Sequence, residues 1–375
     1  MKFEINMINV KDGDSIILQL EKTKKKSLII IDGGYKRHYE KLERRVLELL
    51  PKYDNKIDLI VCTHYDNDHL EGISLLLDYC KQNDVEIEEI WLHKIENKLI
   101  NLVDGMNSKE KELNERNDFS RLSTYVPGDL TEMFDSEKGN LVIENYRFLI
   151  ALLQKIIDYG WEDRIREVVK DDFLDGFEEF QVISPTRDFY NKLLPKLKDE
   201  KFVADVQRTV EARMLSEEVD LENETDFDEL IFDTAYPCDR LEKSSIENGV
   251  TPTNLVSIVT LLTVNNLKFL FTADAGIETF EDQKLLTSEL KDLDWLQLPH
   301  HGSKNNTSLR MLNHFNPVIV YVSGKNAENR PSTKIKNCLQ EKERFKEIHV
   351  TNEKTDTWYL KIGNDLDTEQ VSWTI

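Results

Sequence analysis

The stretch from Ile57 to Gly72, IDLIVCTHYDNDHLEG, constrains the fold of this chain more than any other. It begins with a short apolar, β-branched run at 57–63, which has the length and composition of a buried strand. After a polar cluster, apolar residues recur at helical spacing: Leu70, Ile73, Leu76, Leu77 and Cys80. The cluster therefore lies between the carboxyl end of a strand and a helix, where open α/β sheets place their sites.

Four side chains that can bind a metal occupy that turn, namely His64, Asp66, Asp68 and His69. Taken singly they have structural interpretations, because Asp68 could cap the helix and His64 could be hydrogen-bonded at the strand end. Two carboxylates in one turn repel each other unless a cation neutralises them. The sequence therefore predicts a metal site here.

The motif HYDNDH resembles the HxHxDH signature of the metallo-β-lactamase superfamily, in the HxDxDH form of the hydrolase domain of the competence protein ComEC. Further segments follow in the order of that family: GDSIILQL at 13–20, IIIDGG at 29–34, NLVSIVTLL at 254–262, FLFTADAG at 269–276 and LPHHGS at 298–303. The resemblance implies an α/β fold, the four-layer αββα sandwich. Residues 1–94 would form its N-terminal half and residues 251–375 its C-terminal half.

The middle of the chain, residues 95–250, has no counterpart in that resemblance apart from a core strand expected near 177–185. It carries 37 Asp+Glu and 20 Lys+Arg, so most of the net charge of −22 belongs to it. We interpret it as an acidic, largely helical insertion, and apolar spacing predicts two helices over 145–173 that break near Gly160. Such a surface could recruit a protein partner, but it lacks the basic footprint of a general nucleic-acid binder.

The flanking halves alternate between strand and helix patterns, as expected for sheets with helices packed on them. Strands are expected at 2–10, 15–21, 28–32, 87–93, 254–264, 267–276, 294–303, 318–324, 346–351 and 357–362. Helices are expected at 40–50, 277–292, 307–315 and 333–345.

The four cysteines are widely spaced, and Cys62 and Cys80 lie on apolar patterns, which favours buried thiols over a disulfide framework. No segment approaches the apolar length of a membrane span, and the first residues lack a signal-peptide core. We therefore expect a cytoplasmic protein with no membrane partner. The sequence does not indicate an oligomeric state.

The resemblance also implies roles for individual residues. His64 and Asp66 would hold one divalent ion, Asp68 and His69 a second, and Asp274 would bridge the two. Asp274 could instead cap the helix expected at 277–292, and Asp32 could support the metals or simply form a turn. His93 ends a strand near the site, but a lone histidine is more often structural.

The paired histidines of LPHHGS would complete the site. One of them would bind metal, for which we assign His300, and the other would transfer a proton, for which we assign His301. The chain departs from the ComEC-like pattern at Arg330, which stands before Pro331 where that pattern has a histidine. Arg330 could stabilise phosphate charge instead.

These features predict a metal-dependent hydrolase of a phosphodiester or nucleotide, in which a metal-activated water attacks phosphorus and Asp68, His301 and Arg330 assist. The cofactors would be two divalent ions, Zn²⁺ or Mn²⁺, and the carboxylate-rich ligand set is also compatible with Mg²⁺. The alternative is a degenerate metal-binding platform that recruits a partner without turnover.

Overall fold

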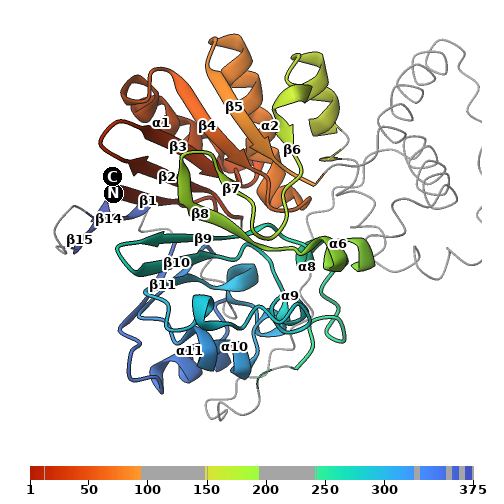
Figure 1. Cartoon of the computed structure of the whole chain (residues 1–375), viewed down its shortest axis with the longest axis vertical. Coiled ribbons are helices and arrows are strands. Elements are labelled where there is room, and N and C mark those ends of the chain that lie inside the picture. The colour runs from red at the N-terminus through yellow and green to blue at the C-terminus, as the bar shows by residue number, and fades with distance from the viewer. Residues whose placement is uncertain are drawn as a thin grey trace, which may run out of the picture.

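The structure is a computed structural model that describes residues 1–11, 13–93, 148–149, 151–193, 241, 243–324, 330–351, 357–362 and 368–373. Two mixed β-sheets face each other, and helices cover the outer face of each (Figure 1). The four-layer αββα arrangement expected from the sequence is therefore confirmed.

The first sheet is built around the N-terminal strands, in the order β15-β14-β1-β2-β3-β4-β5-β6. Its strands are β1 (Lys2–Ile8), β2 (Ile16–Glu21), β3 (Lys26–Ile31), β4 (Lys56–Val61), β5 (Glu86–Trp91), β6 (Ile165–Arg166), β14 (Thr357–Ile362) and β15 (Thr368–Trp373). Strands β3 to β6 are parallel, so the carboxyl ends of β3, β4 and β5 lie at one edge.

The second sheet has the order β13-β12-β11-β10-β9-β8-β7. Its strands are β7 (Phe173–Leu174), β8 (Phe177–Ser184), β9 (Val259–Val264), β10 (Leu267–Phe271), β11 (Trp295–Gln297), β12 (Ile319–Val322) and β13 (Glu347–Val350). Strands β10 to β13 are parallel, and β9 and β10 form a hairpin. Its turn residues Asn265 and Asn266 have φ of 51° and 69°, as a two-residue hairpin turn requires.

Three apolar clusters separate the four layers. The helices α1 (Tyr39–Leu49) and α2 (Asn67–Gln82) pack on the first sheet through Leu42, Val46, Leu70, Ile73 and Leu77. Side chains of both sheets, among them Trp91, Phe180, Phe271 and Trp295, fill the space between the sheets. The helices α9 (Ile277–Glu281), α10 (Leu309–Phe315) and α11 (Thr333–Gln340) cover the outer face of the second sheet.

Several expectations about elements are wrong. The chain does break at Gly160, where φ is 72°, but no second helix follows, because a 3-10 turn at Glu162–Arg164 and the short strands β6 and β7 occupy that stretch. The strand expected from residue 254 begins only at Val259, after the short helix α8 (Pro252–Leu255). The helix expected at 277–292 is only α9, because Lys284 turns the chain with a left-handed φ of 56°.

The helical character predicted for 95–147 and 194–240 lies outside the described residues. Within the described part, residues 151–158 and α6 (Arg187–Leu193) are helical. Cys62 and Cys80 are buried free thiols as expected, whereas Cys338 is disulfide-bonded, which the spacing of the cysteines did not indicate. Among the described residues, no helix has the length and apolarity that crossing a bilayer requires.

Candidate metal centre

Loops at the carboxyl ends of strands from both sheets converge on one buried point. His64 follows β4, and Asp68 and His69 lie in the first turn of α2. From the opposite sheet, Asp274 follows β10 and the histidine pair follows β11 within a 3-10 turn at Pro299–Gly302. Side chains distant in sequence thus meet because parallel strands end at the same edge of each sheet.

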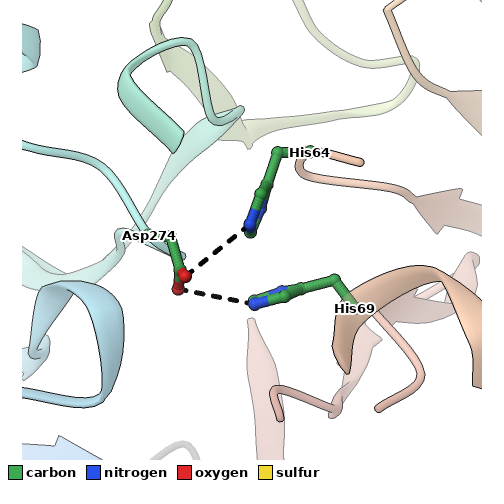
Figure 2. A group of neighbouring side chains, drawn as sticks. All are labelled: His64, His69 and Asp274. Carbon is green, nitrogen blue, oxygen red and sulfur yellow. Dashed lines mark ion pairs between the residues drawn. The ribbon is translucent and has the colours of Figure 1, made fainter. Parts of the chain in front are cut away.

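Asp274 is the centre of this arrangement (Figure 2). Its Oδ2 lies 3.7 Å from His64 Nε2 and its Oδ1 lies 3.4 Å from His69 Nε2. These three side chains are buried, and one ligand atom from each lies within 4.8 Å of the others, so they could hold a cation. Asp66 Oδ2, 3.6 Å from His64 Nε2, borders the same group.

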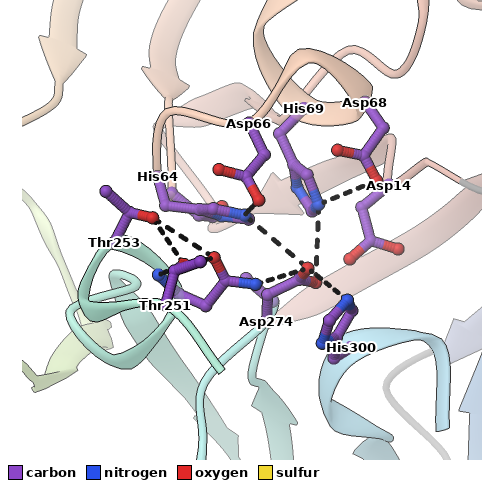
Figure 3. Close-up of polar contacts among 12 residues, drawn as sticks. Asp14, His64, Asp66, Asp68, His69, Thr251, Thr253, Asp274 and His300 are labelled. Atoms are coloured by element: carbon purple, nitrogen blue, oxygen red, sulfur yellow. Dashed lines mark hydrogen bonds and ion pairs between the residues drawn. The ribbon is translucent and has the colours of Figure 1, made fainter. Parts of the chain in front are cut away.

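A second group shares His69 with the first. Asp68 Oδ2 lies 3.6 Å from His69 Nε2 and 3.3 Å from His301 Nε2. His300 Nε2 approaches Asp274 Oδ2 at 3.5 Å from the other side (Figure 3). The structure thus brings together all of the predicted ligands, and His301 rather than His300 belongs to the second cation-sized group.

Hydrogen bonds fix which ring nitrogen of His69 and His64 faces this point. His69 Nδ1 lies 2.8 Å from Asp32 Oδ2 and donates its hydrogen to that carboxylate. Thr63 Oγ1 donates to Asp32 Oδ2 at 2.6 Å, so it can only accept from His64 Nδ1 at 3.0 Å. Each neutral ring therefore turns an unprotonated Nε2 toward Asp274, which is the form that binds a metal.

The paired histidines follow the same rule. His301 Nδ1 lies 3.1 Å from the carbonyl oxygen of Ser323, which can only accept. His300 Nδ1 lies 3.0 Å from Asn306 Oδ1, and the amide nitrogen of Asn306 already donates to the Asp274 carbonyl at 3.0 Å. In their neutral forms, all four rings thus carry their hydrogen on Nδ1 and direct Nε2 at the same carboxylate.

Buried atoms without a partner show that a cation fits here. His64 Nε2, His69 Nε2 and Asp274 Oδ1 are buried and make no hydrogen bond. An unsatisfied buried acceptor costs roughly 1–3 kcal/mol, so three at one point need a common partner. Imidazole nitrogens and carboxylate oxygens are ligands for Zn²⁺ and Mn²⁺, and a divalent ion would satisfy all three.

The charges around this point are strongly coupled. Burial alone would lower the pKa of His69, but the carboxylates of Asp68 and Asp274 raise it well above its usual range. Burial is likewise outweighed at His301, where Asp274 and Asp68 raise the pKa to about 9. Burial raises the pKa of Asp274, yet the neighbouring imidazoles hold it well below the ordinary value.

Glycines allow the loops to approach this closely. A Cβ added to Gly72 would lie 1.9 Å from the carbonyl oxygen of Gly33, and one on Gly13 would lie 2.3 Å from the Asp68 carbonyl oxygen. The turn after β3 therefore packs backbone to backbone on the start of α2, and Gly33 N donates to the carbonyl of His69 at 2.8 Å. This contact sets Asp32 beside the His69 ring.

The remaining sequence candidates have distinct positions. Asp32 supports the site through Thr63 and His69, as the resemblance implied. His93 belongs to neither ligand group, because its Nε2 donates to the Val256 carbonyl at 2.7 Å. The Arg330 segment lies against the histidine turn, since Ser332 N donates to the Gly302 carbonyl at 2.9 Å.

The alternative capping roles do not hold. The N-cap of α2 is Asp66 and not Asp68, and neither the N-cap of α2 nor that of α9 at Gly276 uses a side chain of Asp68 or Asp274. Asp274 instead lies in the loop after β10 and accepts from Asn254 Nδ2 at 3.4 Å.

Sequence reasoning missed some polar residues that surround the ligands, among them Asn254, Asp14 and Gln297. Asp14, from the turn between β1 and β2, lies 3.8 Å from His301 Nδ1, and burial raises the pKa of its carboxyl to about 6. The segment GDS at 13–15 was visible as a motif, but nothing in the spacing indicates that its carboxylate reaches the opposite sheet.

Residues 9–142 match the family model described as the metallo-beta-lactamase superfamily, and this range includes the turn from His64 to His69. Over these residues, which are less than half of its length, the chain is similar to the metallo-β-lactamase superfamily. The four-layer fold is consistent with that similarity. None of the curated proteins compared with the chain matches it.

Among solved structures, the chain is similar to the crystal structure of the hydrolase AbOPH in the beta lactamase superfamily, with 14% identity and a TM-score of 0.28. The alignment covers 70% of this chain and 56% of that one, so the chain spans little more than half the length of that hydrolase. The similarity to the metallo-β-lactamase superfamily therefore rests on the match over residues 9–142, and the two sheets are consistent with it.

Proposed function

We propose that this protein is a metal-dependent hydrolase of phosphodiesters or nucleotides. The observation that carries the proposal is the convergence of four imidazole Nε2 atoms on Asp274, with His69 shared between two groups that could each hold a cation. Two divalent ions so held would activate water near neutral pH and stabilise charge on a phosphoryl oxygen.

The chain's own residues have separable roles in this proposal. Asp274 would fix the separation of the two ligand groups, because its Oδ2 faces His64 and His300 and its Oδ1 faces His69 and His301. His301 is buried, so we assign it to metal binding in place of the proton transfer expected from the sequence. His300, whose side chain is 20% exposed, is the member that can exchange a proton with a leaving group.

Two further observations favour an anionic phosphate substrate. The ligand set contains carboxylates of Asp66, Asp68 and Asp274, which suits hard cations of the kind that phosphate esters bind. The Arg330 segment is hydrogen-bonded to the histidine turn through Ser332, so a guanidinium is carried by the loop that borders the site.

The experiment is to strip the protein of metal, reload it with Mn²⁺, Zn²⁺ or Mg²⁺, and measure metal per chain together with turnover of bis(p-nitrophenyl) phosphate. A chromogenic β-lactam and p-nitrophenyl acetate serve as comparison substrates. We expect phosphodiester turnover that depends on metal and disappears in Asp274→Asn. Hydrolysis of only the comparison substrates would overturn the substrate class, and bound metal with no turnover of any substrate would favour the binding platform.

The matched control is Asp58→Asn. Asp58 is a buried carboxylate of β4 that accepts from Leu28 N at 2.8 Å and pairs with Lys56 at 2.7 Å. It belongs to neither ligand group. Its replacement should lower stability but leave metal content and turnover per folded molecule unchanged.

A further inference from the structure

Asp14 is connected to three ligand-bearing segments at once. Its backbone N–H donates to the Asp68 carbonyl at 3.2 Å. Its Oδ2 accepts from Gln297 Nε2 at 2.7 Å, and Gln297 Oε1 in turn accepts from Thr272 N at 3.1 Å, two residues before Asp274. Its Oδ1 accepts from the Ser323 hydroxyl, which lies 3.3 Å from His301 Nδ1.

The direction of these hydrogen bonds determines whether His301 Nδ1 faces a hydrogen-bond donor or an acceptor. An ionised carboxylate can only accept, so Asp14 takes the hydroxyl hydrogen of Ser323. The Ser323 oxygen then presents only lone pairs to His301 Nδ1. With the Ser323 carbonyl at 3.1 Å as the other acceptor, the ring must carry its hydrogen on Nδ1.

We propose that Asp14 is a positioning residue that sets the tautomer of His301, so that its unprotonated Nε2 faces the divalent cation site beside Asp68. The inference rests on the proposed function, because it concerns how this chain presents a nitrogen to a metal. Asp14 performs for His301 the role that Asp32 performs for His69, but through a serine hydroxyl and from the opposite sheet. Outer-shell partners of this kind change metal affinity by roughly 10–100-fold when they are removed.

The chain offers a substitution that reverses the hydrogen-bond direction. In Asp14→Asn, an amide oxygen facing Ser323 would leave the amide NH₂ against the Gln297 NH₂, which is a clash of two donors. The amide therefore turns the other way, its NH₂ donates to the Ser323 oxygen, and the freed hydroxyl hydrogen donates to His301 Nδ1. This donor competes with the Ser323 carbonyl, which still accepts from Nδ1, so a larger fraction of His301 rings carries the hydrogen on Nε2, where it blocks metal binding.

A second substitution should restore the original direction. In the double variant Asp14→Asn with Gln297→Glu, one oxygen of the new carboxylate accepts from Thr272 N, as the native Gln297 does. Its other oxygen accepts from the NH₂ of the new amide at position 14. The oxygen of that amide then faces Ser323 again. The total charge of the two positions equals that of the native pair. Recovery of the native tautomer and metal affinity would therefore depend on the direction of the hydrogen bonds and not on charge.

The test measures two quantities on wild type, Asp14→Asn, the double variant and Asp58→Asn. The first is metal affinity and stoichiometry by calorimetry with Zn²⁺ and Mn²⁺. The second is the ring tautomer of His301 in metal-free protein at pH 10, read from ¹H–¹⁵N long-range spectra of the histidines and assigned with His301→Gln. That pH lies above the pKa of about 9 for His301.

We expect Asp14→Asn to increase the fraction of His301 that carries its hydrogen on Nε2 and to weaken the binding of one ion by roughly 10–100-fold. The double variant should recover both readouts, and Asp58→Asn should change neither. An unchanged tautomer and affinity in Asp14→Asn would overturn the inference, as would equal losses in Asp58→Asn. The tautomer measurement needs no metal. A wild-type protein that binds no metal would therefore refute the proposed function, whereas the tautomer of His301 would still test the role of Asp14.

Discussion

Asp274 is the residue at which a purely structural role and a metal-binding role predict different effects of a substitution. It is buried, it faces His64, His69, His300 and His301, and it caps no helix. Asp274→Asn keeps the shape and the hydrogen bond to Asn254 but removes the negative charge that would hold the proposed cations. We expect the loss of at least one metal and a fall in kcat of roughly a hundredfold, on the order of 3 kcal/mol in the barrier.

The measurement is metal per chain and kcat on one folded sample, with cooperative thermal unfolding as the check of folding. Full metal content with native kcat in Asp274→Asn would refute its bridging role. The prediction could be made from the sequence, because Asp274 directly follows an apolar strand. The four-histidine environment could not, since it depends on how the two sheets face each other.

His93 provides a pH prediction that is independent of metal. It is buried, its Nε2 donates to Val256, and burial lowers its pKa to about 4. Above the unfolded pKa of about 6.5 both states are neutral, and as pH falls toward 4 only the unfolded state takes up the proton. The native state should therefore lose about 3 kcal/mol between pH 6.5 and pH 4 through this residue.

The variant His93→Gln keeps a donor for the Val256 carbonyl and does not titrate. Denaturant unfolding at pH 7 and pH 4 should show a smaller loss of stability in His93→Gln than in wild type. Equal losses in both proteins would show that His93 is already protonated in the native state.

At the scale of elements, the contact between the β3 turn and α2 decides the position of the site. Gly72 lies against the Gly33 carbonyl, so Gly72→Ala must push α2 away from the turn that carries Asp32. We expect a loss of about 1–3 kcal/mol of stability together with weaker metal binding, because Asp32 holds His69. Glycine-to-alanine replacement at Gly160, which has open space around its Cβ position but a left-handed φ of 72°, should cost stability and leave metal binding unchanged.

Elements with strong local signals were predictable, and those set by tertiary packing were not. The turn from β4 into α2 carries its periodicity and its ligands in one stretch, so sequence reasoning found it. Residues 165–174 have helical apolar spacing, yet they form β6 and β7, because β5 and β8 offer open edges for pairing. The choice between His300 and His301 also needed the fold, since only the structure shows that His301 is buried beside Asp68 while the side chain of His300 is 20% exposed.

At the scale of the molecule, the candidate centre joins the two halves of the sandwich. His64, Asp68 and His69 extend from the first sheet, and Asp274, His300 and His301 extend from the second. A cation held between them would link the sheets at one edge, while the apolar layer between the sheets holds the rest. Binding of divalent ions would also relieve the repulsion among the buried carboxylates of Asp66, Asp68 and Asp274.

Metal removal should therefore lower the stability of the whole fold. A ligand that binds only the native state at a hundred times its dissociation constant adds about 2.7 kcal/mol, which for a chain of this size is a shift of roughly 3 °C in melting temperature. We expect chelation to lower the melting temperature by about that amount in wild type and by much less in Asp274→Asn, which has already lost metal. Calorimetry before and after chelation, with residual metal measured in each sample, gives the comparison. A wild-type melting curve that does not move after verified metal removal would mean that the convergence of these side chains is maintained by their ion pairs alone, and that no cation links the two sheets.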